Sequence, residues 1–529
     1  MNNWFKGFFK NKRETSLQLL LIVGIAITAN LLGDELLLRL DLTEDNRYTL
    51  SPASEDIAES LDDPVTVTAY FSENMPPQLS QAEDEFRNFL EEFRAYSDGN
   101  LEYRFVNPSE SNQTEQEAQQ AGVRPLSVQV RERDQVSQQR AYLGALFQYG
   151  GKREVVPVIR PGSALEYTIA STIKQLTVDQ KPKIGLLQGH GEPTQQEMTQ
   201  VTSQLSQMYQ ITEVSGLDTA AVPADIEVLI VVAPEQQLSQ EELLKIDQYL
   251  MAGGRAIFAI NTVRTDTRRG MATPMNTGIE RLLSAYNTPV NTNLVLDANA
   301  ANIQVQQQQG AFQIVNQVQY PYIPLASNFG NHPISQGLET VMFQFVSSVD
   351  TSRVDSSQAL TPLVLTSDQA GVSQGRFNLN PMQEWNQQSF MQSHVPLGVA
   401  VEGTFASAFA GIDSVNAELS SSQKTSIVVF GDGDFVINGR GQQQQQQRLP
   451  EDNVNLMVNS VDWLADDTGL IELRTQGVTN RPLVSVADST KTVLKYLNTF
   501  LPIALVIGYG IYRYQRRKIR RRKWIEAGV

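Results

Sequence analysis

The sequence contains no cysteine and only three histidines, and these shortages remove several classes of protein from consideration. Without cysteine the chain forms no disulfide, no thiolate metal site and no cysteine nucleophile. The histidines, His190, His332 and His394, are too far apart in the sequence to form a recognisable zinc motif. The sequence therefore predicts no metal site and no bound cofactor.

Two common catalytic signatures do not occur in a usable form. The pattern GxSxG appears once, at residues 371–375, but no helical pattern follows it, so it does not read as a strand-to-helix nucleophile elbow, and no Walker A sequence occurs. The chain therefore resembles neither a serine hydrolase of the elbow type nor a P-loop NTPase. Any role driven by ATP would then depend on the ATPase of a partner. We predict that the chain is not an enzyme.

Charge is distributed unevenly along the chain. The formal net charge is −16, although residues 1–15 and 513–529 are both basic. The long segment between these ends is therefore more acidic than the chain as a whole. An acidic body with short basic ends is not typical of a nucleic-acid-binding protein, and we predict no nucleic-acid partner.

Two uncharged apolar runs, residues 17–33 and 496–512, lie near the ends of the chain. Each is at the short end of the length that crosses a bilayer core. Basic residues precede the first run and follow the second, so the positive-inside rule places both termini in the cytoplasm and the body of the protein outside it. Two alternatives are a cleaved signal peptide at the first run and, at the second, a buried core helix that ends in a nucleic-acid-binding tail.

Polar and small residues within these runs suggest that the membrane helices also dock against other helices. They are Gln18, Thr28 and Asn30 in the first run and Asn498, Thr499, Gly508 and Gly510 in the second. Such residues are the usual means of helix association in lipid, because apolar packing alone gains little there. The alternative is that glycine is simply common in membrane helices and that Asn30 lies at the interface.

Residues 38–178, which follow the first membrane segment (1–37), alternate between strand and helix patterns. Residues 79–96 place apolar side chains at helical spacing, and the whole order is βαβαββα. This order is typical of a thioredoxin-like domain. Thioredoxin chemistry is excluded because the CxxC motif is absent, so we interpret the domain as an interaction scaffold.

Residues 179–485, which precede the second membrane segment (486–529), predict a further α/β domain. Apolar strand patterns at 184–187, 226–232 and 255–260 alternate with helix patterns at 195–209 and 238–254. Ser239 and Glu242 form a capping box at the start of the second helix. With right-handed crossovers this series gives a flavodoxin-like three-layer domain. Further strands are expected at 313–318, 363–366, 397–401 and 426–430, and a helix at 454–464.

Two pairs of residues are candidates for binding or catalysis. His190 and Glu192 follow the strand 184–187, where open α/β sheets place their ligand sites. Asp432 and Asp434 follow the strand 426–430 in the same way. The alternative for the first pair is capping of the helix at 195 and shaping of the turn, and for the second pair a turn with helix-capping aspartates.

Five stretches in combination resemble one known family. They are RYTLS at 47–51, KIGLLQGHGEP at 183–193, GGRAIFAI at 253–260, SIVVFGDGDFVIN at 426–438 and NLMVNSVDWLAD at 455–466. Together they look like the auxiliary component of gliding-motility-type ABC transporters. The glutamine tracts at 301–310 and 442–447 depart from that pattern and are expected to be loop insertions.

The resemblance implies a periplasmic subunit anchored in the bacterial inner membrane. Such a subunit works with an ABC-2-type permease and a cytoplasmic ABC ATPase, and it binds cargo or another envelope protein. The second domain resembles class I glutamine-amidotransferase-like folds that lack the catalytic cysteine, in agreement with the cysteine-free sequence. The alternative function is a membrane-anchored carbohydrate-binding protein or hydrolase that uses His190 with Glu192, or Asp432 with Asp434.

Overall fold

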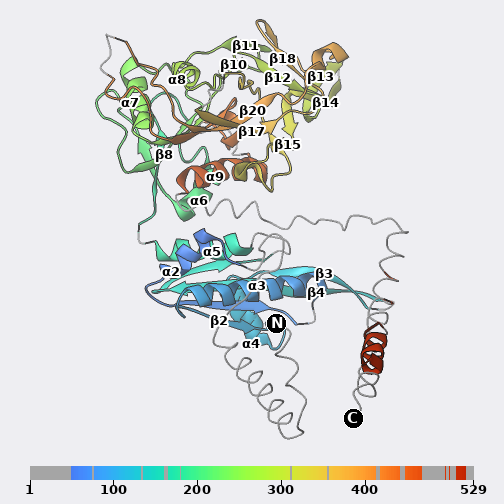
Figure 1. Ribbon diagram of the computed structural model, residues 1–529. Helices are drawn as coiled ribbons and strands as arrows, with labels where there is room; N and C mark the ends of the chain where they lie inside the picture. The colour runs from blue at the N-terminus through green and yellow to red at the C-terminus, as the bar shows by residue number, and fades with distance from the viewer. Residues whose placement is uncertain are drawn as a thin grey trace. The chain divides into compact units, whose positions relative to one another are not determined.

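The structure is a computed structural model (Figure 1). It describes residues 49–73, 75, 77–132, 135–159, 165–178, 180–309, 312–353, 357–412, 417–440, 447–466, 495, 500 and 508–519. The chain divides into two compact units, Met1–Gly477 and Val478–Val529.

The apolar run 17–33 lies outside the described residues, as does most of the run 496–512. Asn30, Asn498 and Thr499 are therefore not described, whereas Gly508 and Gly510 lie in an exposed helix of residues 508–519. No helix in the described ranges is long and apolar enough to cross a membrane. The two membrane helices stay a prediction.

A five-stranded mixed sheet forms the first α/β region. Strand β1 (Val65–Phe71) pairs in parallel with β2 (Leu101–Val106) and antiparallel with β4 (Gln135–Tyr149). Strand β4 also pairs with β3 (Pro125–Glu132) and β5 (Lys152–Val156). The structure extends the predicted order βαβαββα by one strand, and β3 to β5 form consecutive antiparallel pairs.

Helices cover both faces of this sheet. The helices α2 (Pro52–Glu59), α3 (Pro77–Tyr96) and α5 (Leu165–Thr177) share one apolar cluster with the sheet, whereas α4 (Asn112–Gln120) belongs to a second cluster. The apolar face predicted for residues 79–96 is the buried face of α3, because Phe86, Leu90 and Phe93 lie on it and are fully buried.

An eight-stranded sheet forms the centre of the second α/β region. Its order is β15-β17-β20-β21-β9-β8-β6-β7. The strands are β6 (Lys183–Leu187), β7 (Gln210–Val214), β8 (Ile226–Val232), β9 (Arg255–Ala259), β15 (Asn328–Phe329), β17 (Gln358–Leu365), β20 (Pro396–Gly403) and β21 (Thr425–Phe430). Strands β7, β6, β8, β9 and β21 are mutually parallel, and the remaining three add antiparallel pairs.

Two helical layers sandwich this sheet. One cluster contains α6 (Thr199–Met208) and α9 (Glu451–Ala465), and the other contains α7 (Gln240–Met251) and α8 (Ile279–Ala285). Strand β8 shows why both faces are buried, since Val228 and Ile230 point into the first cluster while Leu229 and Val231 point into the second. The second region is therefore a three-layer α/β domain.

Eight further strands extend the domain beyond the main sheet. They are β10 (Val263–Asp266), β11 (Met271–Pro274), β12 (Leu294–Asp297), β13 (Ala300–Gln309), β14 (Phe312–Ala326), β16 (Val341–Met342), β18 (Ala370–Ser373) and β19 (Phe377–Asn378). They form three small sheets around a cluster that includes Leu294, Tyr320 and Phe377. The α/β class is thus confirmed, whereas the thioredoxin-like and flavodoxin-like assignments stay predictions.

Two local expectations are wrong. The first glutamine tract is strand β13 rather than a loop, because its alternation places Asn302 and Gln304 in solvent and Ile303 and Val305 half-buried. The helix expected from residue 195 begins at Thr199, after a turn. Most of the second glutamine run, residues 442–446, lies outside the described residues.

Candidate functional site

The two predicted residue pairs lie at the same edge of the eight-stranded sheet. The loops that follow β6, β8, β9 and β21 all emerge there, because these strands are parallel. From β6 the chain passes to β7 on one side of it, and then to β8 on the other side. Open α/β sheets bind ligands outside the carboxyl ends of strands at such a reversal. A ligand site is therefore expected between the loops that follow β6 and β8.

His190 in the β6 loop contacts a carboxylate through each ring nitrogen. Its Nδ1 atom lies 3.3 Å from Oε1 of Glu192, and its Nε2 atom lies 3.0 Å from Oε1 of Glu242. The backbone N–H of His190 also donates to Oε2 of Glu192 at 2.6 Å, and the Glu192 side chain is fully buried. A neutral imidazole has only one N–H. Both ring contacts are therefore hydrogen bonds when the ring is an imidazolium.

Glu242 joins this loop to the start of α7. The predicted capping box is confirmed: Ser239 N–H donates to Oε2 of Glu242 at 2.8 Å, and the hydroxyl of Ser239 accepts from the Glu242 N–H at 3.3 Å. Burial raises the pKa of Glu242, but the hydrogen bonds from Ser239 and the positive charge of His190 outweigh it, so the pKa lies below its usual value. One carboxylate thus both caps the helix and holds the imidazole.

Backbone hydrogen bonds close the loops after β6 and β8 against each other. The N–H groups of Glu235 and Gln236 both donate to the carbonyl of His190 at 2.8 Å. Gly191 permits this approach, because its φ is +84° and a Cβ atom there would lie 3.1 Å from Cβ of Glu235. The two loops therefore contact each other directly at the point where the sheet order reverses.

The second predicted pair divides into a buried and a partly exposed carboxylate. Asp432 is fully buried and accepts hydrogen bonds from the N–H groups of Gln344 at 2.8 Å and Asp434 at 2.6 Å. Burial, and next the charge of Asp434, raise the pKa of Asp432 well above its usual range, while the backbone N–H donors oppose the shift. Asp432 shapes the turn after β21 and is not accessible to a ligand.

Asp434 is held by the loop that follows β9. The Nδ2 atom of Asn261 donates to Oδ2 of Asp434 at 3.0 Å, and Oδ1 of Asn261 accepts from the N–H of Gly433 at 2.8 Å. Gly433 is packed so closely that a Cβ atom there would lie 2.5 Å from the carbonyl oxygen of Ala259. The amide of Asn261 therefore fixes Asp434 relative to β9 through both of its polar ends.

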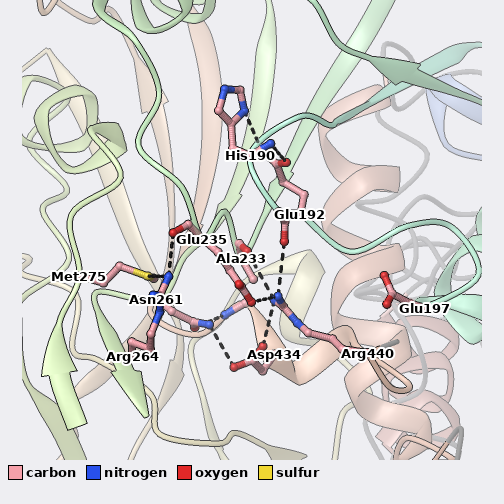
Figure 2. A network of polar contacts seen from close by, with 12 residues as sticks. His190, Glu192, Glu197, Ala233, Glu235, Asn261, Arg264, Met275, Asp434 and Arg440 are labelled. Carbon is pink, nitrogen blue, oxygen red and sulfur yellow. Dashed lines mark hydrogen bonds and ion pairs between the residues drawn. The ribbon is translucent and has the colours of Figure 1, made fainter. Parts of the chain in front are cut away.

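Arg440 connects the two predicted pairs into one network (Figure 2). Its Nη1 atom donates to the carbonyl of Gly191 at 3.4 Å and to the carboxylate of Glu235. Its Nη2 atom donates at 3.4 Å to both the carbonyl of Ala233 and Oδ1 of Asp434. One guanidinium thus contacts groups that follow β6, β8 and β21. No sequence motif marked Arg440, which lies beyond the predicted strand and next to a glutamine run.

The other two histidines lie away from this network. His332 is buried against Trp463, with ring centroids 4.8 Å apart, and its Nδ1 atom accepts from the N–H of Ile334. Burial lowers the pKa of His332 to about 4. His394 is exposed and pairs with Asp368 at 3.1 Å. Within the described ranges no group of three or more metal-binding side chains occurs.

This arrangement differs from that of a catalytic triad. In a triad the histidine has one nitrogen on a carboxylate and the other free to take a proton from a nucleophile. Here Glu192 and Glu242 occupy both nitrogens of His190. The groups at the strand ends therefore contact one another across loops that follow different strands. The fold and this network together define a three-layer α/β domain with a hydrogen-bonded network at its strand ends.

Comparison with protein families gives the chain its class. A family described as an ABC-type uncharacterized transport system, an auxiliary transporter component, matches residues 181–460, which is more than half of the chain. The chain therefore belongs to this family of ABC-transporter auxiliary proteins. A domain of unknown function matches residues 44–148 separately.

Two individual proteins are also similar. An uncharacterized protein of Borreliella burgdorferi is 22% identical over 529 residues, covering 96% of this chain and 99% of its own length. The solved N-terminal domain of mmIFT52 covers 54% of this chain and 97% of its own, with 15% identity and a TM-score of 0.32. These likenesses do not identify a ligand.

Proposed function

We propose that the chain is a non-catalytic, membrane-anchored auxiliary subunit of an ABC-2-type transporter. It would lie in the bacterial inner membrane, with both termini in the cytoplasm and the α/β domains in the periplasm. Those domains bind cargo or an envelope partner, the membrane helices dock on the permease, and a cytoplasmic ABC ATPase supplies the energy. The family match over residues 181–460 is the observation that carries this proposal.

The network at the strand ends supports the non-catalytic part. His190 has carboxylates at both ring nitrogens, and Arg440 contacts the carbonyls and carboxylates that face it. A catalytic base needs a free position within hydrogen-bond reach of the proton that it removes. The parallel order of β7, β6, β8, β9 and β21 also supports a flavodoxin-like or amidotransferase-like origin for this domain.

Co-purification of the full chain in a mild detergent tests the proposal. A tagged chain should enrich an ABC-2-type permease and an ABC ATPase, identified by mass spectrometry. The matched control is the same tag on an unrelated two-pass membrane protein at equal abundance. Enrichment of neither transporter component, in cells that express both, would contradict the proposed role.

A second candidate function is binding or hydrolysis of a carbohydrate. The observation in its favour is that His190 and Glu192 lie together at the sheet edge where α/β domains bind ligands. Alanine substitutions at His190, Glu192 and Asp434 distinguish the two functions, whereas Asp432 is fully buried and reports only on the fold. Loss of glycan binding or of turnover in the His190→Ala variant, with transporter association intact, would favour this candidate.

A further inference from the structure

Strands β13 and β14 form a two-stranded antiparallel arm, here called the glutamine arm (residues 300–326). Their register runs from Asn302 opposite Gln319 to Gln309 opposite Phe312. The arm belongs to the three-layer domain, where Figure 1 labels both strands. Neither the family match nor the strand-end network gives the arm a role.

The glutamine arm is free of charge in an acidic protein. No Asp, Glu, Lys or Arg occurs from Ala298 to Leu338, although the whole chain has a net charge of −16 and 19% charged residues. Natural proteins usually place charged residues on exposed strands to prevent pairing with other chains. The arm lacks this protection, which is a feature of surfaces that do pair.

The edge of the arm formed by β13 is open, whereas β14 pairs on its other side with β16 at Leu325 and Ala326. Strand β13 is the terminal strand of its sheet, and among the described residues its only strand partner is β14. A register irregularity interrupts the pairing near Ala300, and from Asn302 onward the register is continuous. Alternate residues of an edge strand turn their backbone N–H and C=O groups away from the paired strand. Strand β13 therefore offers a regular row of backbone groups to a further strand.

The two faces of β13 differ in polarity. Asn302, Gln304 and Gln306 are exposed on one face, whereas Ile303 and Val305 are half-buried on the other. A partner strand that matches both faces would have amide side chains and β-branched apolar side chains in the same alternation. Asparagine and glutamine side chains form hydrogen-bonded ladders when like strands pair.

We propose that β13 pairs edge to edge with β13 of a second copy of this chain, antiparallel around a two-fold axis at Gln304. In this register Gln304 faces its own copy, and Asn302 faces Gln306. On the other face, Ile303 of each copy lies opposite Val305 of the other copy. A two-fold contact of this kind is self-complementary. Polar side chains of one copy meet polar side chains of the other on one face of β13, and apolar side chains meet apolar side chains on the other face.

Charge favours a second copy over an unrelated strand. Two acidic chains repel each other wherever carboxylates meet, and like charges placed directly opposite destabilise a strand pair. The uncharged arm is a surface at which two copies can meet without that repulsion. A basic or acidic partner, in contrast, would find no opposite charge on the arm to recognise.

The cysteine-free sequence allows a direct test with the full chain in detergent. Directly opposite residues of an antiparallel pair have Cβ atoms about 4.5–5.5 Å apart, within reach of a disulfide after small adjustment. The Gln304→Cys variant should therefore form a disulfide-linked homodimer under mild oxidation. The Gln317→Cys variant should not, because its residue, although exposed, lies on β14, the strand of the arm that does not take part in the proposed contact.

The register has its own control on the same strand. In the proposed pair, Asn302 lies about 14 Å along the strand from its own copy, at roughly 3.4 Å per residue. An equimolar mixture of Asn302→Cys and Gln306→Cys chains should form a disulfide between one chain of each kind. The Asn302→Cys variant alone should give at least about tenfold less cross-linked dimer than this mixed product.

Charge at the axis gives a measurement without cross-linking. Gln304→Glu places two carboxylates opposite each other and should weaken dimerisation at least about fivefold in sedimentation experiments, whereas Gln304→Asn should change it little. A monomer at all concentrations, or equal cross-linking at Gln304 and Gln317, would overturn the proposal. Cross-linking of Gln304→Cys only to a different protein would overturn it as well, in favour of a foreign strand.

Discussion

The Nε2 atom of His190 lies 3.0 Å from Oε1 of Glu242, which joins the loop after β6 to the first turn of α7. The same carboxylate caps α7 through Ser239. This bond spans the sheet edge at which α/β domains usually bind a ligand. Because side chains of the protein itself contact both ring nitrogens of His190, we expect substitutions in this network to alter the local stability of the loops.

The first prediction concerns His190 itself. The His190→Ala variant leaves the buried carboxylate of Glu192 without its side-chain partner, a change that costs about 1–3 kcal/mol. Amides in residues 188–193 and 235–243 should then exchange hydrogen about 5- to 150-fold faster, as measured by mass spectrometry. The control is His394→Ala, since His394 is exposed and its removal should leave exchange in these segments unchanged. Equal protection in the His190→Ala and native chains would show that the imidazole does not hold the loops.

The second prediction concerns the guanidinium of Arg440. Arg440→Lys keeps the charge but cannot contact Gly191, Ala233 and Asp434 together, since an ammonium group lacks the planar fork. Both Arg440→Lys and Arg440→Ala should raise the rate of amide hydrogen exchange in residues 233–237 by about 2- to 10-fold. Lysine should restore less than half of the protection that alanine loses, because it restores only the charge. Arg353→Lys is the matched control, because Arg353 pairs with Asp350 at an exposed position. Full protection in Arg440→Lys would mean that charge alone holds the loops.

The third prediction concerns pH and His332. Burial lowers the pKa of His332 to about 4 in the folded chain, compared with about 6.5 for an unperturbed histidine. Between these values the unfolded chain binds more protons than the folded chain, so this group favours folding above pH 6.5 and loses that contribution as pH falls toward 4. The loss amounts to about 2–3 kcal/mol.

A substitution isolates this contribution from that of the carboxylates. His332→Asn keeps a side-chain acceptor for the N–H of Ile334 but does not titrate. The fall in unfolding temperature between pH 7.5 and pH 4.5 should be smaller in His332→Asn than in the native chain, whereas His394→Asn should behave like the native chain. Identical falls in all three chains would show that His332 is already accessible to protons.

Local patterns in the sequence predicted local structure well. The capping box at Ser239 and Glu242 and the buried face of α3 were both predicted, because each depends on residues within one or a few turns. Placement of His190 and Glu192 after a parallel strand was likewise enough to bring them to the sheet edge. Strand β7 was missed because its pattern is only half-apolar, as suits an edge strand.

The contacts between distant segments were not predictable in the same way. His190 and Glu242 are 52 residues apart, and Gly191 and Arg440 are 249 residues apart. No spacing rule links such residues, since only the sheet order brings their loops together. Strand β13 was misread for a different reason: glutamine favours loops by composition, but alternation with isoleucine and valine suits a half-buried strand.

The last prediction concerns Gly508 and Gly510 in the helix of residues 508–519. Both are exposed in the second compact unit, and an added Cβ at either position would meet nothing within 4 Å. They are two residues apart, so their faces differ by about 200° at 100° per residue. Under the proposed function, that spacing suits close contact with more than one helix of the permease.

Leucine substitutions separate anchoring from docking at these glycines. The Gly508→Leu/Gly510→Leu chain should stay in the membrane fraction, because leucine is favourable there, but should recover at least about fivefold less permease in mild detergent, because backbones can no longer approach closely. Ile511→Leu is the matched control, since it changes an exposed residue of the same helix without adding bulk. Unchanged recovery of the permease in the double variant would mean that the glycines are not contact positions and that other parts of the chain hold the complex together.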